Sequence, residues 1–479
     1  MSDALAVLMP GFVGTTLPAW VRELLEDGLG GVCLFGMNLE SPEQVRALTA
    51  EIHAANPLAV VAIDEEGGDV SRLYQAVGSP FPGNAVLGRL DDVALTAAVG
   101  RQVGWELRDA GVDLALAPDV DVNANPLNPV IGVRSFGAEP ELVARHGAAW
   151  VEGLQSTGVA GCAKHFPGHG DTAEDSHLAL PVVDADTATL RARDLPPFAA
   201  AVAAGVKTVM TSHILVPALD EAPATFSRRI LEGLLREELG FEGVIVTDAL
   251  DMKGASGERG IPAAAVDAIA AGADFLCIGT ANTHEQMTEI AAALETAVAS
   301  GALPAGRLAQ AAARVHGLGW AASQARADAV APFEPGRISG VGVAEVAAAI
   351  EVTDDAQRLL AERGGRALAW LRIESTPNIA VGDSPWGPFA AGVEAAATLV
   401  PGGDVAQWLA AARDALPVIV GKDLHRHAHA RDAVAAARER GDVIVVEMGW
   451  PARDPRLWDV ATHGASRLVG EALAFRMER

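Results

Sequence analysis

Short runs of apolar residues alternate with longer segments of helical periodicity over the first two thirds of the chain. Such near-continuous runs are typical of strands that are buried on both faces of a parallel sheet. Eight strands with intervening helices over about 300 residues predict a (β/α)8 barrel in an α/β protein, and a doubly wound open sheet is the rival architecture. The predicted strands are Ala4–Met9, Gly31–Phe35, Leu58–Asp64, Leu114–Val122, Gly161–His165, Thr208–His213, Gly243–Asp248 and Phe275–Gly279.

Two of the intervening helices carry clear start signals. Ser41 precedes Pro42 and stands three residues before Gln44, which predicts an N-cap with proline at the first helical position. A second helix is predicted over 228–239, with Ser227 as its N-cap and Gly240 as its end.

A segment rich in proline and glycine interrupts this pattern after residue 325. It contains Pro332 and Pro335, and such composition suits a linker, which we predict over 326–343. Further apolar strands are predicted beyond it at Asn378–Gly382, Pro417–Gly421 and Asp442–Glu447. The sequence therefore predicts a catalytic barrel domain over 1–325 and a smaller α/β sandwich-like domain over 344–479.

Composition and charge narrow the class of protein. Half of the residues are hydrophobic and 20% are charged, which is typical of a globular chain. The 36 basic and 62 acidic residues give a net charge of −26. So acidic a protein repels phosphodiester backbones and anionic membrane surfaces, and we expect neither nucleic acid nor a membrane as partner.

The cysteines and the first residues bear on the compartment. Cys33, Cys162 and Cys277 are widely separated and form no CxxC pair, so neither a disulfide framework nor a zinc knuckle is predicted. The chain starts Met1-Ser2-Asp3 and lacks the basic beginning of a secretory signal. We therefore expect a cytoplasmic protein.

Polar residues collect where the predicted strands end. Asp64 ends the third strand, Lys164 and His165 the fifth, His213 the sixth and Asp248 the seventh. One such residue could cap a helix or satisfy a local hydrogen bond. The carboxyl ends of barrel strands meet at one mouth, so four strands that all end in polar residues favour a catalytic site.

The segment that follows the fifth strand, residues 164–177, holds three histidines and three acids. Pro167, Gly168 and Gly170 prevent it from being a helix. Asp175 stands two residues before His177 and can orient its imidazole, which would make His177 a general acid/base.

Metal binding is the competing interpretation of this histidine-rich loop. A metal-dependent barrel hydrolase would be expected to carry a His-x-His pair at the end of its first strand, where this chain has Met9-Pro10. We therefore predict neither a metal nor an organic cofactor and keep the metal-dependent hydrolase as an alternative.

The loop also carries a resemblance to a known family. Residues 164–177 resemble the KHFPGHG…DSH signature of family 3 glycoside hydrolases, in the bacterial β-N-acetylglucosaminidase branch. The supporting matches run in the family's order over residues 1 to about 320. They are Gly28–Asn38, Asp64–Arg72, Asn125–Gly137, Met210–Ile214 and Val246–Gly254.

The resemblance implies a role for each matched residue. Asp248 corresponds to the nucleophile, and His177 to the acid/base with Asp175 as its partner. Asp69 is a departure, because the family more often has arginine there, and we expect it to change local electrostatics without abolishing catalysis. The residues that correspond to sugar-binding positions are Asp64, Arg72, Arg134, Lys164 and His165.

The implied activity is that of a retaining exo-β-N-acetylglucosaminidase that forms a covalent glycosyl-aspartate. Its saccharide substrate would carry a terminal GlcNAc, and muropeptide fragments and short chitooligosaccharides remain equally open. Because a histidine base is neutral once deprotonated, inorganic phosphate could replace water as acceptor, and a β-N-acetylglucosaminide phosphorylase is the alternative. A sugar-binding protein without turnover is a third interpretation, and the oligomeric state stays open.

Overall fold

The computed structural model describes residues 2–174, 180–257, 259–328, 330–338, 340–376 and 378–478. The chain divides into two compact units, each of which joins segments that are far apart in the sequence. Unit 1 comprises Met1–Glu66, Val93–Ala124 and Ala138–Pro335, and unit 2 comprises Gly67–Asp92, Asn125–Gly137 and Gly336–Arg479.

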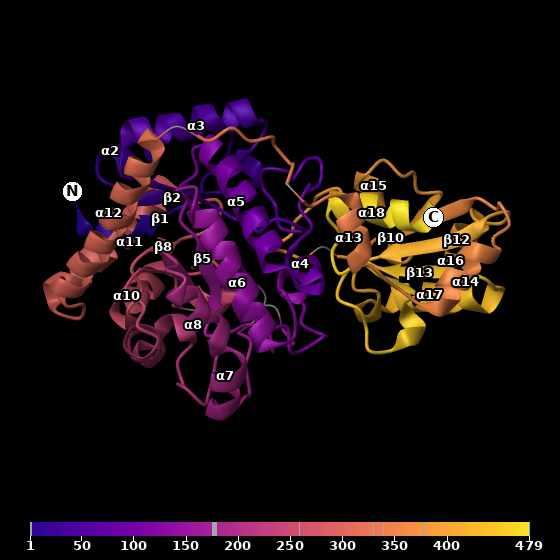
Figure 1. The fold of residues 1–479 in the computed structure, drawn as a ribbon. Helices are drawn as coiled ribbons and strands as arrows, with labels where there is room; N and C mark the ends of the chain where they lie inside the picture. Colours follow the sequence, from indigo (N-terminus) through magenta and orange to yellow (C-terminus); the bar gives the residue numbers. More distant parts are fainter. Residues whose placement is uncertain are drawn as a thin grey trace. The chain divides into compact units, whose positions relative to one another are not determined.

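Unit 1 contains a strand in each of the eight predicted places, and in Figure 1 helices lie outside these strands. Most strands are shorter than predicted, because only part of each apolar run pairs with a neighbouring strand. They are β1 (Leu8–Met9), β2 (Gly31–Leu34), β3 (Val60–Ile63), β4 (Leu114–Ala115), β5 (Cys162–Phe166), β6 (Thr208–Thr211), β7 (Val244–Val246) and β8 (Leu276–Cys277).

All pairings between these strands are parallel. The sheets have the orders β2-β3-β4, β5-β6-β7 and β1-β8. In the first two sheets, strands that follow one another in the chain are paired, and in the third the first strand of unit 1 pairs with its last. Single parallel bridges, Leu114 to Ala160 and Val246 to Phe275, extend the pairing from β4 toward β5 and from β7 toward β8. The predicted α/β class with parallel strands is confirmed.

Apolar side chains from all eight strands form one buried cluster. The cluster also includes Val315 of the long helix α12 (Ala305–Ala327). Alternate residues of each strand point into this cluster, as the period of two in a strand requires. The strand residues are Met9, Cys33, Val60, Ala62, Leu114, Cys162, Met210, Val244, Val246 and Cys277.

The other helices of unit 1 separate the strands in sequence. They are α1 (Asp3–Ala6), α2 (Ala19–Glu26), α3 (Pro42–Ala55), α5 (Val93–Asp109), α6 (Pro140–Gln155), α7 (Thr187–Arg193), α8 (Leu195–Ala203), α9 (Lys253–Ser256), α10 (Ile261–Ala271) and α11 (His284–Ser300). Two short 3₁₀ helices are η1 (Gly36–Asn38) and η3 (Ala224–Phe226). The longer η4 (Arg229–Glu238) is a π-helix.

Both predicted helix starts are confirmed. The Ser41 hydroxyl accepts a hydrogen bond from the Gln44 amide at 3.2 Å, and α3 begins at Pro42. The Ser227 hydroxyl accepts from the Ile230 amide at 3.1 Å. The helix that follows Ser227 has the wider π geometry rather than the α geometry that the pattern indicated.

Two predicted strands begin or end in the wrong place. Ala4–Ala6 lie in the helix α1, where the Ser2 carbonyl accepts from the Leu5 and Ala6 amides, and alanine favours this local bonding. The strand predicted over 114–122 stops at Ala115. Pro118 has no amide hydrogen to continue a regular ladder, and beyond it the segment is joined to β5 by a single parallel bridge, from Asp119 to Lys164.

Unit 2 is built on a six-stranded sheet of order β11-β10-β12-β13-β14-β9, in which only the edge strand β9 is antiparallel. The predicted strand at 378–382 is wrong. The Asn378 side chain accepts from the Ala380 amide at 2.9 Å and makes this segment a turn. The strands are β9 (Glu351–Val352), β10 (Leu368–Ile373), β11 (Ala397–Leu399), β12 (Leu416–Gly421), β13 (Ile444–Glu447) and β14 (Val460–Ala461).

Helices cover both faces of this sheet. One apolar face packs on α16 (Val405–Ala410) and α17 (Ala428–Arg440), and Figure 1 shows α13, α15 and α18 on the other side. The remaining helices of unit 2 are α4 (Asn84–Leu90), η2 (Gly132–Arg134), α13 (Val343–Ala349), α14 (Asp354–Glu362), α15 (Gly387–Ala390), η5 (Leu424–Arg426), η6 (Pro455–Leu457) and α18 (Arg467–Glu478).

The two early segments of unit 2 bond to its late segments. The Asp69 carboxylate accepts from the Ala465 amide at 2.7 Å, and the Asn378 side chain donates to the Pro129 carbonyl at 3.0 Å. Arg89 of α4 pairs with Glu351 of β9 at 2.9 Å. Unit 2 therefore needs residues from three separate parts of the chain.

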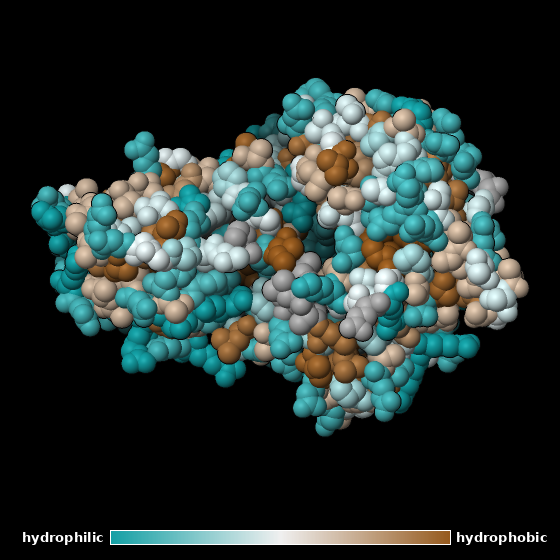
Figure 2. Space-filling model, turned by 180° about the vertical axis from the view of Figure 1, so that it is seen from behind, coloured by the Kyte–Doolittle hydropathy of each residue, from teal (hydrophilic) through white to brown (hydrophobic). Residues whose placement is uncertain are grey.

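On the face that Figure 2 shows, hydrophilic residues predominate and hydrophobic ones occur in small groups. Large exposed apolar side chains include Val13, Leu127 and Trp320. Among the described residues, we find no helix with the length and apolarity that crossing a bilayer requires.

Candidate active site

A buried lysine stands between two carboxylates at the end of the β3 and β5 strands. Lys164 Nζ lies 2.8 Å from Asp64 Oδ1 and 2.7 Å from Glu66 Oε1. The Lys164 side chain is 2% exposed, and that of Asp64 is 22% exposed. Both acids hold the ammonium group in one position, and Asp64 keeps part of its surface for a ligand.

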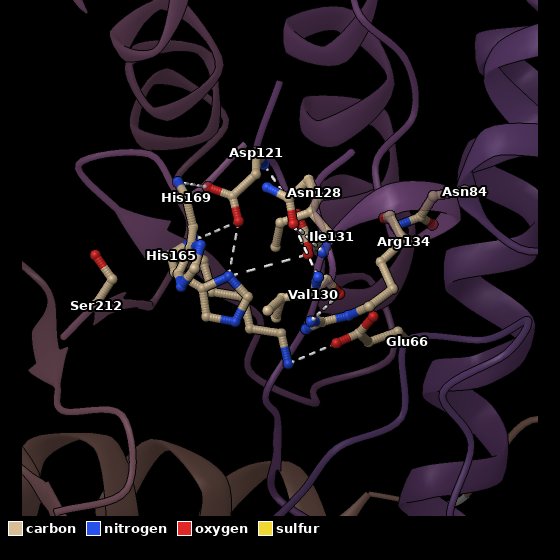
Figure 3. A network of polar contacts seen from close by, with 12 residues as sticks. Glu66, Asn84, Asp121, Asn128, Val130, Ile131, Arg134, His165, His169 and Ser212 are labelled. Carbon is tan, nitrogen blue, oxygen red and sulfur yellow. Dashed lines mark hydrogen bonds and ion pairs between the residues drawn. The ribbon is translucent and has the colours of Figure 1, made fainter. Parts of the chain in front are cut away.

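His165, the next residue of β5, is bound by a second buried acid. Its Nδ1 lies 2.7 Å from Asp121 Oδ2, and its amide donates to the same oxygen at 3.2 Å. The other oxygen, Asp121 Oδ1, accepts from the His169 amide at 2.6 Å. In Figure 3, dashed lines join both histidines to the Asp121 carboxylate.

Burial and nearby charges in unit 1 shift the pKa values of His169 and Cys162. Burial lowers the pKa of His169 to about 4, against a raising effect of Asp121 and Asp248. Burial also raises the pKa of the Cys162 thiol to about 12. The charge of Lys164 lowers this pKa, and those of Asp64 and Asp248 raise it. Lys164 of β5 contacts Asp64, and Asp248 follows β7 of the same parallel sheet, so Lys164 and Asp248 lie toward the same edge of that sheet.

Asp248 itself follows β7 by two residues, where the loop is fixed by local bonds. Its Oδ1 accepts from the Ala249 amide at 2.8 Å, and the Ala249 carbonyl lies 3.0 Å from His213 Nε2. His213 Nδ1 lies 2.9 Å from the Thr225 hydroxyl. His213, predicted as a strand-end residue, thus supports the Asp248 loop from the neighbouring strand.

The two arginines of the predicted set belong to unit 2. The Arg72 guanidinium donates to the Ala380 carbonyl at 2.6 Å, and Arg134 Nη1 donates to the Val130 carbonyl at 3.1 Å. The Arg134 carbonyl accepts from the Asn84 side chain at 2.6 Å. Both side chains are nearly buried, which fixes their orientation within unit 2.

The predicted acid/base pair, Asp175 and His177, lies outside the described residues. The preceding part of the loop is described, and its first turn is anchored by the His169 amide on Asp121 and by Thr172, whose hydroxyl lies 2.9 Å from His169 Nδ1. The roles of Asp175 and His177 stay predictions.

One set of buried side chains in the described residues has metal-ligand character. Possible ligand atoms of Asp119, Asp121 and His165 lie within 4.8 Å of one another. Both oxygens of Asp121 already accept hydrogen bonds, two of them from His165 itself. This geometry is that of a carboxylate that orients an imidazole, and a metal would have to displace these bonds.

Sequence reasoning missed Glu66, Asp119 and Asp121. The two aspartates stand at the end of the predicted fourth strand, so the rule that found Asp64 and Asp248 applies to them as well. Asp119 accepts from the Asp121 amide at 2.9 Å. Glu66 gave no signal of its own, because its contact depends on the length of Lys164 and on the turn after β3.

Other predicted features have ordinary structural roles. Asp251 accepts from the Thr280 amide at 3.3 Å, and the N-cap of α9 is Met252. The histidines of the 425–429 segment are half-buried, and His429 Nε2 lies 2.8 Å from the Glu374 carbonyl. Asp69 serves as an acceptor for a backbone amide, which an arginine could not do.

Curated relatives carry the name β-hexosaminidase. The β-hexosaminidase A of Pseudoalteromonas piscicida is 39% identical over 315 residues, which are 59% of this chain and 52% of that protein. The β-hexosaminidase of Methylococcus capsulatus is 39% identical over 293 residues, or 60% of this chain and 86% of that protein. This chain therefore matches about half of the first relative and most of the second.

Solved structures resemble both the whole chain and its larger part. A family 3 β-N-acetylglucosaminidase from a Paenibacillus species has a TM-score of 0.86 at 32% identity, covering 100% of this chain and 96% of that one. NagZ from Neisseria gonorrhoeae, in complex with N-trifluoroacetyl-D-glucosamine, has a TM-score of 0.55 at 34% identity, covering 65% of this chain and 97% of that one.

The family model for the glycosyl hydrolase family 3 N-terminal domain matches residues 14–318, which is more than half of the chain. This match confirms the resemblance that the loop after β5 indicated. With its strand-end acids and its buried Lys-His pair, the chain belongs to glycosyl hydrolase family 3 and is a glycoside hydrolase.

Proposed function

We propose that this enzyme is a retaining exo-β-N-acetylglucosaminidase that removes terminal GlcNAc through a covalent intermediate on Asp248. The observation that carries the proposal is that Asp248 follows β7 in the parallel sheet whose strand β5 carries Lys164 and His165, with Asp64 bound to Lys164, in a family 3 chain. The names of its relatives, which are β-hexosaminidases and β-N-acetylglucosaminidases, support the choice of sugar.

In the first step, an oxygen of Asp248 attacks the anomeric carbon while the glycosidic bond breaks. His177 donates a proton to the departing oxygen, and Asp175 orients its imidazole. In the second step, His177 takes a proton from water, whose oxygen replaces Asp248 at the anomeric carbon. Two inversions give net retention, and both side chains return to their starting states.

Polar groups at the strand ends of unit 1 would hold the sugar. Asp64 has exposed surface and a fixed position, so we assign it to the sugar hydroxyls together with Lys164 and His165. The sugar-binding roles that the resemblance implies for Arg72 and Arg134 stay predictions. The N-trifluoroacetyl-D-glucosamine in the Neisseria gonorrhoeae structure supports a site of this kind for an N-acylated sugar.

We favour water over phosphate as the acceptor. Around Lys164 and His165, unit 1 places the acids Asp64, Glu66 and Asp121, and their charge opposes the entry of an anion. The substrates that we propose are muropeptide fragments or short chitooligosaccharides. We propose that the enzyme acts in the cytoplasm.

We also propose that the strands of unit 1 close into a (β/α)8 barrel. The single cluster of inward residues from β1 to β8 supports closure, as does the Cys33 amide that donates to the Pro10 carbonyl at 2.9 Å, between β2 and the end of β1. The domain assignment 1–325, 326–343 and 344–479 remains part of the proposal as an order along the chain, and the compact unit 2 also includes residues 67–92 and 125–137.

Release of a chromophore from an aryl β-N-acetylglucosaminide tests the function. Asp248→Ala should lower kcat by on the order of 10³-fold or more, because no other group can form the glycosyl ester. Asp251→Asn is the matched control, since it changes an acid of the same loop but keeps an acceptor for the Thr280 amide. Undiminished activity in Asp248→Ala would refute the assignment.

A further inference from the structure

Asp121 is a fully buried carboxylate that no sequence argument singled out, and it bonds to two different parts of the site. Three donors converge on it, namely the His165 amide, His165 Nδ1 and the His169 amide. Figure 3 shows these bonds as a single group of dashed lines. We propose that Asp121 is a positioning residue that fixes the tautomer of His165 and anchors the start of the loop that carries Asp175 and His177.

The tautomer follows from the chemistry of the contact. A carboxylate can only accept, so the 2.7 Å contact requires a proton on His165 Nδ1. In the neutral ring, Nε2 then carries the lone pair. The amide of His165 donates to the same oxygen, so the ring and its backbone are held by one group. A sugar hydroxyl would therefore always meet the same nitrogen.

The second bond reaches the loop. Asp121 Oδ1 accepts from the His169 amide at 2.6 Å, four residues beyond His165 and six before Asp175. Gly170 adds a close approach here, since a Cβ on it would lie 1.8 Å from the Val122 carbonyl oxygen. The loop thus begins in contact with the segment 121–122, and Asp121 is the side chain that binds it.

Asp121 is itself held in place. The neighbouring acid Asp119 accepts from the Asp121 amide at 2.9 Å, while its other oxygen lies 3.9 Å from His165 Nδ1. The short contact of 2.7 Å identifies Asp121, not Asp119, as the acid that orients the ring.

Asp121→Asn is the informative change because it keeps the size of the side chain. An amide group has one accepting oxygen, whereas Asp121 uses both oxygens as acceptors. The variant must therefore either lose the His169 bond or present its NH₂ group to His165 and move the ring proton to Nε2. Asp404→Asn is the matched control, because Asp404 also accepts two backbone amides but lies at the start of α16 in unit 2.

The first test reads the proton directly. In ¹⁵N-histidine spectra of the full chain, with His165 assigned by its loss in His165→Gln, we expect Nδ1 to be protonated in the wild type. We expect this signal to change in Asp121→Asn and to stay in Asp404→Asn. An unprotonated Nδ1 in the neutral wild-type ring would overturn the proposal, and this readout does not depend on any enzymatic activity.

The second test rests on the proposed function and separates positioning from folding. Asp121→Asn should lower kcat/KM on aryl β-N-acetylglucosaminides by on the order of 10²-fold, as the loss of an orienting carboxylate does elsewhere. In a His165→Ala background, the same change should cost less than about threefold, because the group that it orients is gone. Losses that multiply in the double variant would mean a general structural role and refute the positioning of His165.

The loop contact has its own readout. If Asp121 also anchors the loop with the acid/base pair, Asp121→Asn should lose more activity on a GlcNAc disaccharide than on an aryl glycoside, whose leaving group needs little protonation. Equal losses on the two substrates would overturn this half of the proposal. A wild type without activity on either substrate would refute the proposed function and leave the tautomer test standing.

Discussion

The buried imidazole of His169 should make the folded chain lose stability as the pH falls from neutrality toward 4. Burial lowers the pKa of His169 from its ordinary 6.5 to about 4, so the native state resists a proton that the unfolded chain accepts. The folded pKa lies below the unfolded one in this case. Stability from the neutral imidazole is therefore complete above pH 6.5, is lost as the pH falls between 6.5 and about 4, and changes no further below that.

The size of the effect follows from the shift. The full displacement of the pKa corresponds to about 3 kcal/mol of unfolding free energy. Between pH 7 and pH 5, linkage predicts that the His169 imidazole alone lowers the free energy of unfolding by about 2 kcal/mol. His169→Asn removes the titration while its amide can still donate to the Thr172 hydroxyl, so the variant should lack this loss.

Urea unfolding of the wild type and of His169→Asn at pH 7 and pH 5 measures the difference. The variant is expected to be less stable at pH 7, because the imidazole packs in a closed site, and the gap should narrow by about 2 kcal/mol at pH 5. Thr172→Val is the control, since it removes the hydrogen bond to His169 and keeps the ring. A gap that stays constant between the two pH values would refute the reasoning.

Three further predictions concern the chemistry. His177→Ala should lose little of the first step on aryl glycosides and much more on GlcNAc disaccharides, measured by pre-steady-state kinetics, and equal losses would make His177 structural. In phosphate buffer, NMR of the products should show free GlcNAc with retained configuration at first release, and GlcNAc-1-phosphate would instead establish phosphorolysis. EDTA should leave the activity unchanged, because Asp121 and His165 are already bonded to each other; loss of activity that zinc restores would favour a metal at these residues.

The strands of unit 1 were predictable because a strand that is buried on both faces consists of consecutive apolar residues, as in Val60–Ile63. Their ends were less so. Ala4–Ala6 are equally apolar in a helix and in a strand, and only the local bonds to the Ser2 carbonyl decide between them. In the 114–122 run, Pro118 has no amide hydrogen to donate, but the parallel bridge from Asp119 to Lys164 lies beyond it, so the proline alone did not mark the end of pairing.

The site was predictable where a residue stands at a strand end or in a distinctive loop, as Asp248 and Lys164 do. Asp121 would have followed from the same rule, but nothing in its spacing reveals that it bonds to His165, which lies 44 residues later. The partners of Arg72 are beyond any local pattern, since its guanidinium donates to carbonyls 308 and 309 residues away. Such contacts arise only when the chain is folded.

The composition of unit 2 from three stretches of chain has a consequence for how the protein can be made and divided. Its first stretches, 67–92 and 125–137, leave the ribosome long before 336–479, which supplies their partners Ala465, Glu351 and Asn378. During synthesis these bonds cannot form until their partners, from Glu351 to Ala465, have emerged. For the same reason, a cut after Pro335 does not release a finished module: it would leave Arg72 and Asp69 on the shortened chain with their acceptors and donors removed, so gene fusions should keep all 479 residues together.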